Sequence, residues 1–207
     1  MYLVINLGLK SIRGILFNGI GKKKFQVNYK IKTKIIGQFV EQNPIEYRFL
    51  FFKILKELNK KNLTKKINYI STTTSANCLM LIGKKGNLCS NVITVLDRRC
   101  ERLSKDINKN SKFRFKSEMQ LLKVLWYKKN KPKIFKKSKY WINNGDYLNF
   151  LLTDKIFTDS LNYQKFEFKN KKFTNDFLKK NKLDKNCIPK KFSIGTKFKL
   201  SDNIKKI

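Results

Sequence analysis

The chain has 207 residues, of which 48 are Lys or Arg, 14 are Asp or Glu and none is His, so its formal net charge is +34. This length fits one domain of ordinary size or two small ones, and an apolar content of 41% does not fit a disordered chain. The absence of histidine excludes Ser-His-Asp triads, Cys-His dyads and His-ligated zinc sites.

The positive charge suggests a polyanionic partner, because lysines neutralise phosphates and release counterions. Most of the basic residues are Lys, however, and only 6 are Arg, the residue that suits base edges and bidentate phosphate binding. The lysines are scattered, and Lys, Asn, Ile and Phe, which share A- and T-rich codons, make up about half of the chain. We therefore attribute the charge mainly to the base composition of the gene, and we expect nucleic acid to bind only non-specifically.

The cysteines and the apolar runs indicate the cellular compartment of the protein. The four cysteines (Cys78, Cys89, Cys100 and Cys187) show no C-x-x-C spacing and are interpreted as free thiols in a reducing cytosol. The apolar run at residues 1–5 is too short for a signal peptide, and no apolar run approaches the ~18 residues of a membrane span. We therefore expect a cytoplasmic protein with no membrane partner.

The first quarter of the chain is predicted to consist of strands and a helix start. Two β-prone runs, Tyr2–Leu7 and Ser11–Phe17, flank Gly8, and residues 25–36 alternate well enough for a third strand, so an antiparallel three-strand meander is expected. Asn43-Pro44-x-Glu46 then has the cap, proline and acid of a helix start. Its apolar face, up to Leu58, is predicted to contain Ile45, Phe49, Phe52 and Leu55.

The remainder is predicted to mix strands with helices. Strands are expected at 67–73, 79–82 and 92–96, with a turn at 84–87. Helices are expected after a Ser117 cap, from Pro132, over 144–152, and after a Thr174 cap with Phe173 and Leu178 as a hydrophobic staple. This order of elements indicates a single domain of the α/β or α+β class.

The opening hairpin carries the most informative motif, Asn6-Leu7-Gly8-Leu9-Lys10-Ser11-Ile12-Arg13. It resembles the phosphate hairpin of the FGGY family of carbohydrate kinases, Asp-x-Gly-Thr-Thr-Ser-x-Arg. In such a hairpin, backbone N–H groups approach the nucleotide phosphates, hydroxyls bond phosphate oxygens and the acid holds magnesium. The resemblance implies phosphate contacts from Asn6, Gly8, Leu9, Lys10, Ser11 and Arg13, and a magnesium contact from Asn6.

Further landmarks follow in family order over nearly the whole chain. They are Glu41-Gln42-Asn43-Pro44, the segment 70–77, Leu96-Asp97-Arg98-Arg99, the Lys-x-x-Trp-x-x-x-x-x-Pro pattern from Lys123 to Pro132, Asp146-Tyr147-Leu148, Thr158-Asp159, Ile188-Pro189 and Gly195-Thr196. The resemblance implies a ribonuclease H-like α/β domain of the actin/hexokinase ATPase type. Its mixed sheet would open with the antiparallel meander and be flanked by helices, and residues 1–207 would form one N-terminal domain.

The same resemblance implies a sugar site formed by Ser75, Ala76 and Asn77 together with Asp97 and Arg99. Two alternatives stay open from the residues themselves. Asn77 could bond a sugar hydroxyl or satisfy its own loop backbone. Asp97 and Arg99 could contact the sugar, but we favour a local ion pair that supports the loop.

The sequence also departs from the family pattern. Asn6 stands where the family has an acid and is a poorer magnesium ligand, while Leu9 and Lys10 replace two threonines. In the family, the aspartate that accepts the proton of the sugar hydroxyl, and the domain that binds most of the ATP, lie beyond the matched motifs. We therefore expect no catalytic residue and no C-terminal ATP-binding domain in residues 1–207.

These observations support three hypotheses. The first is the sugar-binding half of an ATP- and Mg²⁺-dependent kinase for a sugar or polyol, inactive alone. It would be either a fragment of a broken gene or one chain of a split enzyme with a separately encoded C-terminal half. The second is a non-catalytic domain, decayed or repurposed to bind a sugar or a partner, which the changes at Asn6, Leu9 and Lys10 favour. The third is a basic nucleic-acid-binding protein, favoured by charge alone.

Overall fold

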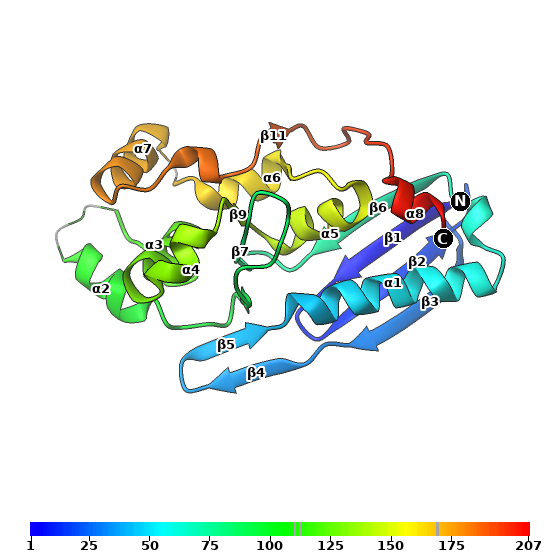
Figure 1. The fold of residues 1–207 in the computed structure, drawn as a ribbon, viewed down its shortest axis with the longest axis horizontal. Coiled ribbons are helices and arrows are strands. Elements are labelled where there is room, and N and C mark those ends of the chain that lie inside the picture. Colours follow the sequence, from blue (N-terminus) through cyan, green and yellow to red (C-terminus); the bar gives the residue numbers. More distant parts are fainter. Residues whose placement is uncertain (110, 112, 169) are drawn as a thin grey trace.

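The main sheet of the chain contains the hairpin described above. A computed structural model describes residues 1–109, 111, 113–168 and 170–207. The sheet has the order β3-β2-β1-β6 and is formed by β1 (Tyr2–Leu7), β2 (Ser11–Phe17), β3 (Lys23–Lys30) and β6 (Tyr69–Thr74). β1 and β3 flank β2 in antiparallel pairs, whereas β6 pairs with β1 in parallel. The antiparallel meander is therefore confirmed, and β6 makes the sheet mixed (Figure 1).

The expected third strand, 25–36, is divided into two. β3 ends at Lys30, and β4 (Thr33–Ile36) joins β5 (Phe39–Gln42) and β8 (Val92–Ile93) in a separate sheet of order β4-β5-β8. Between them Ile31 is buried, and its N–H donates to the Lys10 carbonyl at 3.0 Å. This contact with the β1–β2 turn ends β3, so the prediction of one long strand was wrong. The β4–β5 hairpin projects from the molecule (Figure 1).

Helix α1 (Pro44–Lys60) begins as predicted, with the Asn43 side chain accepting a hydrogen bond from the Ile45 N–H. Its buried face differs from the prediction and consists of Pro44, Tyr47, Leu50, Phe51, Ile54, Leu55 and Leu58. Ile45 and Phe49 are each 64% exposed. The helix approaches β2 so closely that a Cβ on Gly14 would lie 2.3 Å from the Ile54 side chain.

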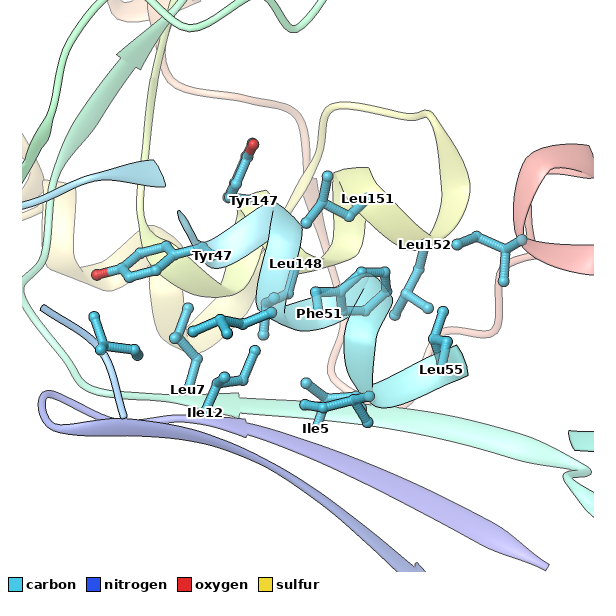
Figure 2. Packing of buried hydrophobic residues seen from close by; sticks show 14 of the residues in the cluster. Ile5, Leu7, Ile12, Tyr47, Phe51, Leu55, Tyr147, Leu148, Leu151 and Leu152 are labelled. Atoms are coloured by element: carbon cyan, nitrogen blue, oxygen red, sulfur yellow. The ribbon is translucent and has the colours of Figure 1, made fainter. Parts of the chain in front are cut away.

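Helix α5 (Asn144–Thr153) covers the same face of the main sheet as α1. Figure 2 shows Tyr47, Phe51 and Leu55 of α1 and Leu148 and Leu152 of α5 gathered over the sheet residues Ile5, Leu7 and Ile12. We call this cluster, with Leu3 and Leu16, the sheet core; α8 (Asp202–Lys205) adds Ile204 to it. The N-terminal hairpin is thus packed against two helices on one face of the sheet.

A second cluster, the helical core, lies away from the main sheet. It is built on α2 (Glu101–Asn108), α3 (Gln120–Asn130), α4 (Pro132–Lys137), α7 (Lys171–Lys180) and the antiparallel pair β7 (Met80–Ile82) and β9 (Tyr140–Ile142). Two predicted helix starts were wrong. α3 begins after Met119 rather than at a Ser117 cap, and Asn170 caps α7, which places Thr174 inside that helix. Helix α2 was not predicted.

The remaining elements connect the two cores. β10 (Thr158–Asp159) pairs in parallel with β11 (Lys191–Phe192), and α6 (Ser160–Tyr163) follows β10. Short 3₁₀ turns occupy Thr64–Lys66, Gln164–Phe166 and Lys185–Cys187. The four cysteines are free. Among the helices of the described residues, none combines the length and apolar character needed to cross a bilayer.

Candidate functional site

The β1–β2 turn is held by its carbonyl groups. The carbonyls of Leu9, Lys10 and Ser11 accept hydrogen bonds at 2.6, 3.0 and 2.9 Å from Gln42 Nε2, Ile31 N and Gly8 N. Within the described part of the chain, the backbone N–H groups of Leu9 and Lys10 have no protein acceptor. Two adjacent N–H groups in a turn are suited to binding an anion such as a phosphate oxygen.

Asn6 lies opposite Arg13 of β2 and Thr73 of β6, on the sheet face away from the sheet core. Its side chain supplies one neutral oxygen, and the neighbouring guanidinium disfavours a cation. In residues 1–109, 111, 113–168 and 170–207, no cluster of three or more acidic, Cys or His side chains is placed to hold a metal ion. A magnesium contact from Asn6 stays a prediction.

Ser11 and Arg13 complete the hairpin. Ser11 is buried, and its Oγ accepts a hydrogen bond from Arg13 Nε at 3.3 Å, whereas the Arg13 side chain is otherwise exposed. The structure thus brings the six residues predicted to contact phosphate together, although the Ser11 hydroxyl already has a partner. Their contacts with phosphate stay a prediction.

The predicted sugar loop lies beside this hairpin. The Ser75 N–H donates to the carbonyl of Leu7, the last residue of β1, at 3.0 Å. Ala76 is exposed, and Asn77 has a left-handed backbone with φ of 56°. Asn adopts this conformation more readily than most residues, so the loop backbone gives Asn77 a structural role. The hairpin and the loop meet at the carboxyl ends of parallel strands, where open α/β sheets commonly bind ligands.

Lys123 of α3 supports the loop from inside. Its side chain is fully buried, and Nζ donates to the carbonyls of Asn77 at 2.6 Å and Thr94 at 2.8 Å. Burial lowers the pKa of Lys123 to about 8. The two carbonyl acceptors favour the ammonium form, so the lysine connects the sugar loop to the segment before Asp97.

Asp97 and Arg99 form a buried network with Glu41, which we call the Arg99 network. Asp97 accepts hydrogen bonds from Val40 N, Arg99 N, Arg99 Nε and Arg99 Nη2 at 2.7, 3.0, 2.8 and 2.7 Å. Arg99 Nη2 also contacts Glu41 at 2.6 Å. Burial alone would lower the pKa of Arg99, but the hydrogen bonds to the two carboxylates outweigh it and raise that pKa.

Aromatic rings enclose the same guanidinium. It lies 4.7 Å from the ring centroids of both Phe39 and Trp126, within the range of cation–π attraction. The expected ion pair between Asp97 and Arg99 is therefore confirmed. A sugar contact from either residue would have to share atoms that are already hydrogen-bonded, and it stays a prediction.

Gln42 was not predicted as a site residue, yet it holds the hairpin in place. It is buried, donates to Leu9 O at 2.6 Å and to Thr33 Oγ1 at 2.8 Å, and accepts a hydrogen bond from Tyr47 OH. The Glu-Gln-Asn-Pro motif marked this residue, but its partner, a backbone carbonyl, leaves no signal in the sequence.

The N-terminus of α5 contributes a buried pair of polar side chains. Asn143 and Asp146 form a capping box, in which Asp146 Oδ2 accepts from Asn143 N at 3.1 Å and Nδ2 at 2.7 Å. Burial raises the pKa of Asp146 to about 8, although the hydrogen bonds from Asn143 oppose this. Asp146 therefore stabilises the start of α5. Asp159 caps α6, accepting from Asn162 N.

The comparisons with known proteins agree on one family. Residues 1–198 match the N-terminal domain of the FGGY family of carbohydrate kinases. The chain is also similar to the xylulose kinase of Bacillus subtilis (strain 168), with 29% identity over 170 residues, covering 75% of this chain and 33% of that protein.

Solved structures show the same fold. The ligand-bound xylulose kinase of Lactobacillus acidophilus superimposes with a TM-score of 0.88 at 22% identity, over 100% of this chain and 45% of that one. The Plasmodium falciparum glycerol kinase with ADP gives a TM-score of 0.82 at 18% identity, over 100% and 46%. The chain therefore spans less than half the length of these relatives. The N-terminal ribonuclease H-like α/β fold expected from the sequence is confirmed.

Proposed function

The chain belongs to the FGGY family of carbohydrate kinases, and from this premise we propose that it is the sugar-binding half of a kinase that transfers the γ-phosphate of ATP to a hydroxyl of a sugar or polyol. The family match over residues 1–198 carries the proposal. It contains the hairpin, the sugar loop and the residues that hold them, within a single N-terminal domain.

The local geometry supports a role in positioning. The open N–H groups of Leu9 and Lys10 suit a phosphate, and the loop from Ser75 to Asn77 lies next to them. Phosphoryl transfer depends on bringing the nucleotide and acceptor together between closing domains. One wall of such a cleft cannot do this alone, so the proposed activity requires the part of the relatives that this chain does not span.

The proposal is tested by reconstitution. The purified chain is mixed with the complementary portion of a family kinase, and ADP release is followed with xylulose, gluconate and glycerol as acceptors. We expect turnover from the pair and none from either part, with Asn6→Asp increasing it because a carboxylate replaces a neutral amide. A pair that stays inactive on all acceptors, with and without Asn6→Asp, would refute the kinase proposal.

A specific observation favours one alternative, a non-catalytic domain that binds a sugar or a partner. Asn6 is paired with Arg13 and no carboxylate cluster is formed in the described residues, so the ligand-facing part of the hairpin is the part that has changed. This alternative predicts sugar binding without turnover, which calorimetry on the chain would detect.

The free cysteines suit a reducing compartment. We therefore place the chain in the cytoplasm, whether it is half of a kinase or a binding domain.

A further inference from the structure

The chain contains the dipeptide Asn-Gly twice, at residues 18–19 and 144–145. This dipeptide is prone to deamidation, because the nitrogen of a glycine can approach the side-chain carbonyl of the preceding asparagine with no Cβ in the way. In this reaction the backbone nitrogen attacks the asparagine Cγ, ammonia leaves and a succinimide ring closes. The fold places the two dipeptides in opposite surroundings.

The first dipeptide lies in the loop of residues 18–22, between β2 and β3. Gly19 is exposed, and a Cβ built on it would meet no heavy atom within 4 Å. Among the described residues, the N–H of Gly19 has no backbone acceptor. The attacking nitrogen is therefore open to water and free to move towards its neighbour.

The side chain of Asn18 is held in place for this attack. Its Oδ1 accepts a hydrogen bond from Lys22 N at 2.8 Å, which draws electron density from Cγ and stabilises the negative charge that develops on Oδ1. Two backbone hydrogen bonds, from Asn18 N to Lys22 O at 3.0 Å and from Gly21 N to Asn18 O at 3.1 Å, keep the loop in this arrangement. The loop thus fixes the electrophile and leaves the nucleophile free.

The charges of the hairpin favour the same reaction. Lys22, Lys23 and Lys24 are exposed, and residues 1–40 contain no Asp or Glu. Cations near the loop stabilise the anion that forms when the Gly19 amide loses its proton, and they also stabilise the carboxylate of the product. The modification would introduce the first acid into a hairpin whose charged residues are all basic.

The second dipeptide is closed to the reaction. Gly145 N is already occupied, because it donates to Asn143 Oδ1 at 2.9 Å. Asn144 is 0% exposed and begins α5, whose capping box holds the first helical turn. A Cβ on Gly145 would lie 2.9 Å from Asn162 Nδ2, so the backbone has little room to rearrange into a ring.

We propose that Asn18 is a site of spontaneous deamidation in the folded chain and that the fold protects Asn144. Hydroxide takes the proton of the Gly19 amide, the nitrogen forms a bond to Asn18 Cγ, and the bond from Cγ to Nδ2 breaks as ammonia leaves with a proton from water. Water then opens the succinimide at either of its carbonyls, which gives aspartate or isoaspartate. Water is the only co-reactant, and each event lowers the net charge of the chain by one.

The test follows both asparagines in the same sample. The chain is incubated at mildly alkaline pH in water enriched in heavy oxygen, and its peptides are then mapped by mass spectrometry. Deamidation replaces an NH₂ group by an oxygen from the solvent, so a modified peptide gains about 3 Da. In the folded chain we expect Asn18 to react at least about tenfold faster than Asn144.

Three controls separate the fold from the sequence. In guanidinium chloride both dipeptides lose their surroundings, and their rates should agree within about threefold. Gly19→Ala adds a side chain to the attacking residue, at a position with room for it, and should slow the reaction of Asn18 by about tenfold. Ile20→Ala changes a side chain that is 86% exposed outside the dipeptide, and should leave the rate within about twofold of the parent.

Each of three results would overturn the inference. The first is the absence of label at Asn18 in the folded chain, and the second is an equal rate at Asn18 and Asn144 before unfolding. The third is a rate at Asn18 that Gly19→Ala and Ile20→Ala change to the same extent, since the glycine nitrogen would then not be the attacking group.

Discussion

The hairpin turn and the Arg99 network differ in how their polar groups are used. In the turn, Lys10 is exposed and two backbone N–H groups lack a protein acceptor in the described chain. In the network, Asp97 and Arg99 are 2% and 7% exposed, and both Asp97 oxygens accept hydrogen bonds from the protein. The turn is thus open to a ligand, while the network is complete without one.

This difference matches where the sequence departs from the family. The segment Leu96-Asp97-Arg98-Arg99 has the acid and the arginine of the motif that it resembles, whereas the hairpin has Asn6, Leu9 and Lys10 in place of an acid and two threonines. The buried network thus fits the family motif, and the open turn departs from it. The comparison predicts that substitutions in the network affect mainly stability, and that substitutions in the turn affect mainly ligand binding.

The largest effect is expected from Asp97→Ala. It leaves the Arg99 guanidinium buried with Glu41 as its remaining carboxylate and removes the acceptor of Val40 N–H. Breaking a buried ion pair in this way costs about 3–5 kcal/mol, which urea unfolding would measure. The control is Arg98→Ala, because Arg98 is 73% exposed and contacts Glu101 at 3.8 Å. A loss as small as that of the control would show that the network does not hold the fold.

Lys123→Met tests the connection between the two regions. It leaves the carbonyls of Asn77 and Thr94 without their donor, and we expect the free energy of unfolding to fall by about 2 kcal/mol at pH 7. Exchange in residues 75–77 should become faster, because the sugar loop loses its internal support.

The same substitution has a defined pH dependence. The pKa of Lys123 is about 8 in the folded chain and 10.5 in the reference state, so the unfolded chain binds more protons between these values. The parent chain therefore gains stability relative to Lys123→Met as the pH rises from 8 towards 10.5, by about 1.4 kcal/mol per pH unit at most. Lys129→Met, at an exposed position of the same helix, should show no such slope. A constant difference between parent and variant would contradict the burial of the charge.

Local patterns predicted the main elements but could not choose between faces. Along α1, Ile45 and Phe49 satisfy the helical period as well as Tyr47 and Phe51 do, and contact with the sheet decides which pair is buried. The break between β3 and β4 likewise depends on the distant contact between Ile31 and Lys10.

The same limit applies to the site. Asp97 and Arg99 are two residues apart, so their pairing was visible in the sequence. Lys123 and Gln42 act on backbone carbonyls 46 and 33 residues away, and a carbonyl acceptor has no residue type that a sequence could reveal.

The substitutions Gly14→Ala and Gly8→Ala compare a tightly packed position with an open one. Gly14→Ala should cost about 1–3 kcal/mol, because the added Cβ would lie 2.3 Å from the Ile54 side chain. At Gly8 φ is not positive, and a Cβ there would meet Ser11 O at an ordinary 3.5 Å. Gly8→Ala should therefore change the unfolding free energy by less than about 1 kcal/mol, although Gly8 belongs to the motif. Thermal unfolding of both variants measures this, and an equal loss would show that the turn is as tightly packed as the sheet core.

The smallest effect on stability is expected from restoring the family's hydroxyls with Leu9→Thr and Lys10→Thr together. Lys10 is exposed and Leu9 is half-buried at the edge of the sheet core, so the loss should stay below about 1 kcal/mol. Binding of ATP to the reconstituted pair should instead tighten by about tenfold, because two hydroxyls would join the open N–H groups of the turn. Ile20→Thr, at a side chain that is 86% exposed in the next turn, serves as the control. If the double variant bound ATP no better than the control, the open N–H groups of Leu9 and Lys10 would be solvated groups rather than a phosphate site. The difference between the two regions would then be one of exposure alone.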